Sequence, residues 1–188
     1  YDIEVTGSLR KIEEKEMLLR VFPNPDTPAP ETHLLSNGKY SVMVTNSGGG
    51  YSRWKNIAVT RWREDAALDN SGMFIYLRDA QTGEFWSTAY QPALKKSRNY
   101  EAIFSRSRAE FKRRDYNIDT YTEIAVSPED DIELRRVKIT NRSRNKRIIE
   151  VTSYAEAVLN YPADDLAHKK FSNLFVQTEI ISQNHAII

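Results

Sequence analysis

Polar and hydrophobic residues alternate along most of the chain after residue 33. Every second residue of IDTYTEIAV (118–126) is Ile, Thr or Val, and KYSVMVTN (39–46) follows the same pattern. A period of two is typical of a strand that buries one face. By the same criterion we expect strands at 73–79, 84–90, 100–105, 108–116, 132–140, 147–160 and 171–181.

Turn residues separate these segments at fairly regular intervals. The sequence AQTG (80–83), with Gly83 at its end, is a hairpin signal between two of them. Short strands spaced roughly ten residues apart favour an antiparallel sandwich over alternating βαβ units. We therefore predict an all-β fold with little helix after residue 33.

The N-terminal part of the chain has a different pattern. Residues 9–19 fit one face of a short helix, but MLLRVF (17–22) fits a strand equally well. PNPDTPAP (23–30) then places four prolines among eight residues, which indicates an extended linker. We divide the chain into an extension, 1–32, and a sandwich domain, 33–188.

Composition narrows the functional classes. The 188 residues suit one domain, and a net charge of +1 gives no electrostatic reason to expect nucleic acid as a partner. There is no cysteine, and His33, His168 and His185 lie far apart. We therefore expect no metal site and no cofactor.

Three consecutive glycines, Gly48 to Gly50, begin an aromatic and basic segment. The sequence GGGYSRW lacks the Lys-Ser/Thr pair of a phosphate loop and is not a dinucleotide-binding fingerprint. The glycines could instead allow positive φ, admit a close neighbour or give a lid mobility.

The residues after these glycines combine aromatic rings with charged groups. Aromatic faces pack on the C–H patches of sugars, and charged side chains bond the hydroxyls. Alternatively, Trp54 and Trp62 belong to the core, and the arginines pair with Glu64 and Asp65. The candidate saccharide-binding residues are Tyr51, Arg53, Trp54, Arg61 and Asp65.

A second polar surface is expected from residues 131–159, which we interpret as two long strands paired with each other. Thr, Glu and Arg gather on one face of these strands, which would be open to solvent or to a groove. Sandwiches that hold sugars often present such a face. We favour cross-strand ion pairs on a solvated surface.

Several segments in order resemble one known family. They are residues 33–92 and the stretches RAEFKRRD (108–115), TEIAVSPEDDIELRRVKITNRS (122–143), IEVTSYAEAVL (149–159) and DLAHKKFSNLFVQTEI (165–180). Together they resemble the N-terminal sugar-binding-type domain of the glycosyltransferase 36 family. That family is grouped with the inverting glycoside phosphorylases of family 94, and the similarity is strongest to members that process β-1,2-glucans.

The resemblance implies an antiparallel β-supersandwich of the galactose-mutarotase type. Family members continue into a helical linker and an (α/α)6 barrel that carries the general-acid aspartate. The resemblance also implies a parent protein that transfers a glucosyl unit between a β-glucan and phosphate with inversion. The chain would then be an incomplete part of the domain, and we assign no catalytic residue to it.

The resemblance also suggests partners. These are a β-glucan or oligosaccharide bound through the full-length protein, the barrel of the parent and a second copy in a homodimer. A freestanding carbohydrate-binding module and a structural or dimerisation module are the alternatives. FVQTEIISQNHAII (175–188) is expected to be a strand without a partner, which predicts self-association.

Overall fold

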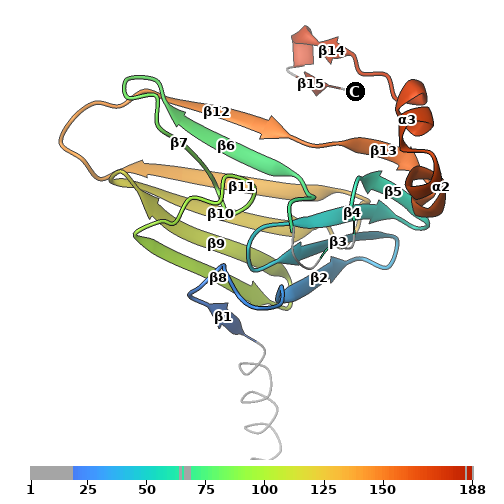
Figure 1. The fold of residues 1–188 in the computed structure, drawn as a ribbon, viewed down its shortest axis with the longest axis horizontal. Coiled ribbons are helices and arrows are strands. Elements are labelled where there is room, and N and C mark those ends of the chain that lie inside the picture. The colour runs from blue at the N-terminus through green and yellow to red at the C-terminus, as the bar shows by residue number, and fades with distance from the viewer. Residues whose placement is uncertain (1–18, 64, 66–68, 185, 188) are drawn as a thin grey trace, which may run out of the picture.

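The computed structural model describes residues 19–63, 65, 69–184, 186 and 187, and Figure 1 shows their arrangement. The described chain is dominated by antiparallel strands. The strands are β1 Arg20–Phe22, β2 Thr32–Ser36, β3 Tyr40–Thr45, β4 Gly50–Trp54, β5 Ile57–Thr60, β6 Phe74–Asp79, β7 Phe85–Ser87, β8 Asn99–Ser105, β9 Arg108–Asp115, β10 Ile118–Val126, β11 Glu133–Asn141, β12 Ile149–Tyr154, β13 Ala157–Asn160, β14 Ile180–Ile181 and β15 Ala186–Ile187. The helices are α2 Pro162–Ala167, α3 Lys169–Ser172, and the 3-10 turns η1 Asn173–Phe175 and η2 Ser182–Asn184.

Three sheets build a sandwich. Sheet A has the order β1-β8-β9-β10-β11, sheet B the order β13-β5-β4-β3-β2, and sheet C the order β12-β6-β7. Sheets B and C together lie over sheet A, each covering a different part of it (Figure 1). The strands β14 and β15 form a separate two-stranded ribbon near the C-terminus. The prediction of an antiparallel all-β sandwich is confirmed.

Two apolar clusters join the layers. In the larger one, Val42 and Val44 of sheet B pack with Phe104 and Phe111 of sheet A. In the smaller one, the side chains of sheet C pack on Ile118 of sheet A. Burial of apolar area is the main stabilising contribution of such an interface.

The alternating pattern is reproduced in the burial of β10. Its residues alternate between buried and half-buried from Ile118 to Ile124, and its register with β11 runs without a break over all nine residues. A slip of one residue would send every buried side chain to the outer face, so this pattern fixes the register.

The expected pairing of residues 131–159 is wrong. Strand β11 pairs with β10 in sheet A, whereas β12 pairs with β6 in sheet C, so the two strands belong to different layers. The expected single strand over 147–160 is divided as well, because the chain passes from sheet C to sheet B between β12 and β13.

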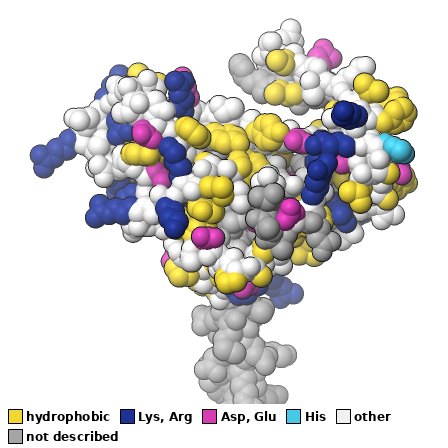
Figure 2. Space-filling view, viewed as in Figure 1, with side chains coloured by type: hydrophobic (Ala, Val, Ile, Leu, Met, Phe, Trp, Pro, Cys, Tyr) yellow, Lys and Arg dark blue, Asp and Glu magenta, His cyan; other side chains and the backbone are white. Residues whose placement is uncertain are grey.

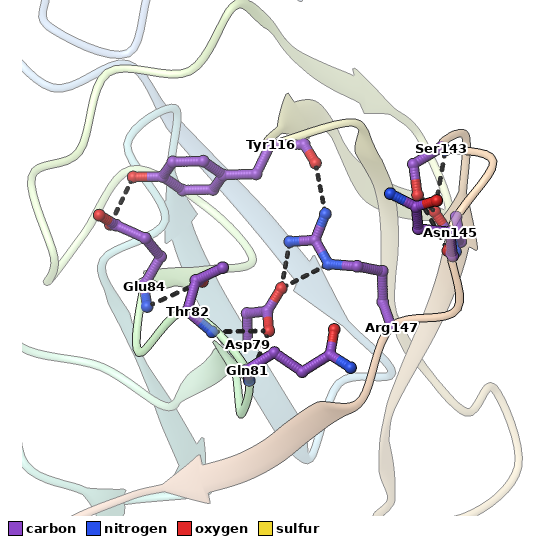
Figure 3. A network of polar contacts seen from close by, with 9 residues as sticks. Asp79, Gln81, Thr82, Glu84, Tyr116, Ser143, Asn145 and Arg147 are labelled. Carbon is purple, nitrogen blue, oxygen red and sulfur yellow. Dashed lines mark hydrogen bonds and ion pairs between the residues drawn. The ribbon is translucent and has the colours of Figure 1, made fainter.

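A buried ion pair holds the connection by which the chain passes from β11 in sheet A to β12 in sheet C. Asp79, at the end of β6, is fully buried, and its Oδ1 accepts the backbone N–H groups of Gln81 and Thr82 in the hairpin turn (Figure 3). Its other oxygen accepts Nε–H of Arg147 at 2.5 Å, and Arg147 also donates to the carbonyl oxygen of Tyr116 at 3.3 Å. The connection between β11 and β12 is thereby held against sheet C.

The expected strand over 171–181 is also wrong, since only Ile180–Ile181 is extended there. Residues 169–175 are helical, and the rings of Phe171 and Phe175 lie 5.0 Å apart. Spacing of apolar residues by three and four positions is the helical pattern, and Phe171, Leu174 and Phe175 follow it. The segment that was expected to remain unpaired instead contains β14 and β15, which pair with each other.

The N-terminal extension contributes to the sandwich before the proline segment. Residues Arg20–Phe22 form β1, an edge strand of sheet A that pairs with β8, which agrees with the strand interpretation of that part. The helix alternative over 9–19 lies almost entirely outside the described residues. Residues 23–30 form neither helix nor strand, and Nδ2–H of Asn46 donates to the carbonyl oxygens of Asn24 and Pro25. The domain boundary at residue 33 remains a prediction.

Candidate functional site: an aromatic and basic surface on sheet B

The glycine turn between β3 and β4 is tightly covered. A Cβ on Gly49 would lie 2.2 Å from Oδ1 of Asp69, and one on Gly48, which has φ +98°, would lie 2.3 Å from Cβ of Ala89. Gly50 has φ +149° and lies against the carbonyl oxygen of Met43. Of the uses considered for these glycines, positive φ and the admission of a close neighbour are both present, and the close neighbours belong to the chain itself.

Asp69 forms part of this turn. Its carboxylate accepts hydrogen bonds from the hydroxyls of Thr45 and Ser47, which flank the turn on β3 and in the loop. Burial raises the pKa of the Asp69 carboxyl, and the two hydroxyl donors act in the opposite direction. Because every described contact of this carboxylate is with the turn, we interpret Asp69 as structural.

Tyr51 and Arg53 are positioned by the alternation of β4. Gly50 and Ser52 are buried against sheet A, so Tyr51 and Arg53, which alternate with them, project from the outer face of sheet B. The guanidinium carbon of Arg53 lies 4.5 Å from the centroid of the Tyr51 ring. The ring of Trp62 packs edge-on to Tyr51 with centroids 5.4 Å apart. These three side chains, which we call the Tyr51 cluster, hold one another in place.

The Tyr51 cluster borders a shallow groove that also contacts α2. Its volume is about 30 Å³, close to the space of one water molecule and too small to enclose a sugar ring. The cluster can therefore form part of one side of a larger cleft. It cannot enclose a saccharide by itself.

Arg61 lies at the base of this groove and is almost completely buried, with 7% of its surface exposed. Nε and Nη2 donate to the two oxygens of Asp165 at 3.0 and 2.8 Å, and Nη2 also donates to Asn173 at 2.6 Å. Nη1 donates to Glu156. The Asp165 carboxylate raises the pKa of the Arg61 guanidinium. Arg61 therefore ties α2 and η1 to sheet B.

These partners differ from the expected ones. Asp165 and Asn173 follow Arg61 by 104 and 112 positions, whereas the alternative had placed Glu64 and Asp65 beside it. Glu64 lies outside the described residues, and Asp65 is exposed in the loop after β5. No local pattern in the sequence could have indicated a contact at such separation.

Trp54 is separated from the Tyr51 cluster. It lies at the end of β4 with 38% of its surface exposed, so the interpretation of Trp54 as a core residue is wrong. Its Nε1–H donates to Asp131 at 2.6 Å in the turn between β10 and β11, and Nζ of Lys55 lies 4.2 Å from the ring centroid. Trp54 therefore packs toward sheet A, away from the outer face that carries Tyr51.

A second groove is also lined by Arg61. It holds about 240 Å³, slightly below the usual range for a ligand pocket, roughly 300 to 1,000 Å³. Figure 2 shows basic side chains gathered beside the C-terminal helices in this region. The other residues that line this groove were not predicted from the sequence, because no motif connects them. They include Arg63, Asn70, Tyr154, Glu156 and Lys169.

The outer face of sheet A carries ion pairs that join β9, β10, β11 and the turn after β11. Glu123 of β10 accepts from Arg108 of β9 and from Arg136 of β11, and Asp119 accepts from Arg114 and Arg142. Cross-strand ion pairs therefore occur on a solvated face, as expected in kind, but they join β11 to β10 and β9 instead of to β12. The same face forms a groove of about 830 Å³ across β8 to β11.

Among residues 19–63, 65, 69–184, 186 and 187, no three His, Cys, Asp or Glu side chains gather as metal ligands would. Within the same residues, no helix has the length and apolar character needed to cross a membrane.

Comparison with known proteins relates the chain to carbohydrate-active enzymes. It is 43% identical to cyclic beta-(1,2)-glucan synthase NdvB of Rhizobium meliloti over 162 residues, which is 86% of this chain and 6% of that protein. It is 33% identical to N,N'-diacetylchitobiose phosphorylase of Vibrio furnissii over 165 residues, 85% of this chain and 20% of that protein. Solabiose phosphorylase of Paenibacillus borealis is 24% identical over 89% of the chain, which corresponds to 22% of its own length.

The chain thus spans a small part of each of these relatives. The family model that describes the supersandwich domain of glycosyl hydrolase 94 matches residues 15–188, which include all three sheets of the sandwich. The chain belongs to the glycosyl hydrolase 94 supersandwich domain family.

Proposed function

We propose that the chain is the carbohydrate-associated sandwich of an enzyme that processes β-glucans, of the glucan synthase or inverting phosphorylase kind. The observation that carries this proposal is the 43% identity to cyclic beta-(1,2)-glucan synthase NdvB over 86% of the chain. In this proposal the catalytic acid belongs to a separate barrel of the parent protein, and the sandwich provides one wall of the saccharide cleft.

Within this wall, the Tyr51 cluster contacts the sugar. On the outer face of sheet B the Arg53 guanidinium lies over the Tyr51 ring and Trp62 packs edge-on to it, and this combined aromatic and guanidinium surface suits a sugar's C–H patches and hydroxyls. Arg61 acts as a positioning residue, because its donors hold Asp165 and Glu156. Trp54 and Asp65 remain candidates outside this cluster.

Titration of the protein with β-1,2-glucooligosaccharides tests the proposal. Binding should release heat and change the fluorescence of Trp62. Tyr51→Ala and Arg53→Ala should both weaken binding, and Arg53→Ala should leave the melting temperature nearly unchanged because its side chain is half-exposed. Lys39→Ala is the matched control, since Lys39 is exposed in the turn between β2 and β3.

A structural role is the second candidate, and exposed apolar side chains near the C-terminus favour it. Leu166, Phe171, Leu174 and Phe175 are 61 to 79% exposed on α2, α3 and η1. Such a patch is expected where another domain docks. If the oligosaccharides produce neither heat nor a fluorescence change, the structural role replaces the proposed one.

A further inference from the structure

The groove on the outer face of sheet A lies on the opposite layer from the Tyr51 cluster. It crosses four adjacent strands, β8 to β11, and holds about 830 Å³, within the usual range for a ligand site, roughly 300 to 1,000 Å³. The proposed function gives it no role. Its floor is a continuous antiparallel ladder, so its side chains project from fixed positions.

Tyr121 is the central aromatic residue of this groove. In register it lies between Lys112 of β9 and Lys138 of β11. Its hydroxyl donates to Glu110, which orients the ring. This hydrogen bond and the strand ladder below already restrict the Tyr121 side chain. Binding of a ligand therefore costs the side chain little conformational entropy, which favours affinity.

Positive charge exceeds negative charge at one end of the groove. Asp119 is shared between two arginines: Nε of Arg142 donates to it at 2.7 Å and Nη2 of Arg114 at 3.1 Å. One carboxylate cannot neutralise two guanidinium groups. These hydrogen bonds, Arg114 contributing most, lower the pKa of Asp119 to about 2, so this charge balance holds at neutral pH.

Lys138 adds a further uncompensated charge. It is exposed on β11, two residues before Thr140, which lies opposite Asp119. In the described part of the chain Lys138 has no acceptor for its ammonium group, whereas Lys112 pairs with Glu101 at 3.2 Å. The remaining N–H donors of Arg142 also have no acceptor among the described residues.

We infer that this groove binds an acidic oligosaccharide, with a carboxylate or phosphate group of the sugar chain at Lys138 and Arg142. The extended groove accommodates the chain of sugars, and the Tyr121 ring provides a surface for one of them. Charge complementarity selects the anion, because the cations at this end lack enough carboxylates to neutralise them. The inference goes beyond the proposed function, which concerns neutral glucan on the other layer.

The test uses calorimetric titration of the protein with four probes. Two are acidic, a glucuronate-containing oligosaccharide and a phosphorylated glucooligosaccharide, and their comparison identifies the preferred anion. The third is a neutral glucooligosaccharide of equal length, and the fourth is a single-stranded oligonucleotide of equal charge. At least one acidic oligosaccharide should bind more tightly than both of the others, and its affinity should fall as salt is added.

Lys138→Glu is the decisive variant and Lys39→Glu its control, because both make the same change of charge at exposed positions of different layers. Lys138→Glu should weaken binding of the acidic oligosaccharide by roughly tenfold, as expected for one charge-assisted contact. Lys39→Glu should leave it nearly unchanged. Equal binding of the neutral probe or of the oligonucleotide, or equal losses in the two variants, would overturn the inference.

Discussion

Gly49→Ala offers a direct test of why three glycines occur in a row. Gly49 has no positive φ, unlike Gly48 and Gly50, so the substitution changes only the space that its side chain needs. The new Cβ would lie 2.2 Å from Oδ1 of Asp69 and 2.7 Å from its Cγ and its backbone oxygen. The Asp69 carboxylate must therefore move.

The cost follows from the contacts that this movement breaks. Overpacking of a well-filled site costs about 1 to 3 kcal/mol. Displacement of the carboxylate also weakens its hydrogen bonds from Thr45 and Ser47, which contribute about 1 kcal/mol each. We expect a total loss of about 3 kcal/mol in the free energy of unfolding, which corresponds to roughly 6 to 12 °C in melting temperature for a chain of this size.

Gly83→Ala is the matched control. Gly83 has φ +76°, and nothing lies within 4 Å of the position that its new methyl group would take, so only backbone strain of about 1 to 2 kcal/mol is expected. Thermal and urea unfolding of both variants measure the difference. In an Asp69→Ala background, Gly49→Ala should cost less than in the wild-type protein. If the melting temperature of Gly49→Ala equals or exceeds that of Gly83→Ala, the close-packing explanation is refuted.

Three further predictions use the same unfolding assays. Arg61→Leu should lower the free energy of unfolding by about 3 kcal/mol, because it leaves Asp165 without its buried partner. The same variant should increase proteolysis within α2 and α3. Unchanged proteolysis would contradict the role of Arg61 in holding these helices against sheet B. Trp54→Ala should cost about 1 to 2 kcal/mol, less than the roughly 3 to 5 kcal/mol of a buried aromatic, because Trp54 is 38% exposed. The Arg114 and Arg142 donors lower the pKa of Asp119 to about 2, so its contribution to stability is present above the unfolded pKa of roughly 4 and is lost as the pH falls toward 2. Asp119→Asn should therefore reduce the fall in melting temperature over that range, and an unaltered acid profile would count against the ion pairs.

The strands could be predicted because their evidence is local. The alternation of 118–126 predicts β10, and the AQTG turn predicts the β6–β7 hairpin that the structure contains. The helix at 169–172 was missed because an apolar run of this length fits either period, and the spacing of Phe171 and Phe175 was the available signal. Assignment of β11 and β12 to separate sheets rests on contacts between distant residues, because β12 pairs with β6 and Arg147 contacts Asp79 across 68 positions.

The candidate site was predicted in part for the same reason. Tyr51 and Arg53 share a face because they are two residues apart on one strand, and a period of two is sufficient to place them together. The same rule puts Trp54 on the opposite face, although closeness in sequence had grouped it with them. Arg61 was correctly singled out by residue type, but its partners lie more than ninety positions later, beyond any local signal.

The two proposed saccharide surfaces can be separated by experiment because they lie on different layers. Tyr51 projects from the outer face of sheet B, and Lys138 from the outer face of sheet A, with the apolar core between them. Effects of distant sites without shared partners add to within about 0.5 kcal/mol. Tyr51→Ala should therefore weaken the binding of neutral glucan alone, and Lys138→Glu the binding of the acidic oligosaccharide alone. In the double variant, the affinity for each ligand should fall by the same factor as in the corresponding single variant. If either substitution weakens both ligands, the protein has one binding surface, and the assignment of separate roles to the two layers is incorrect.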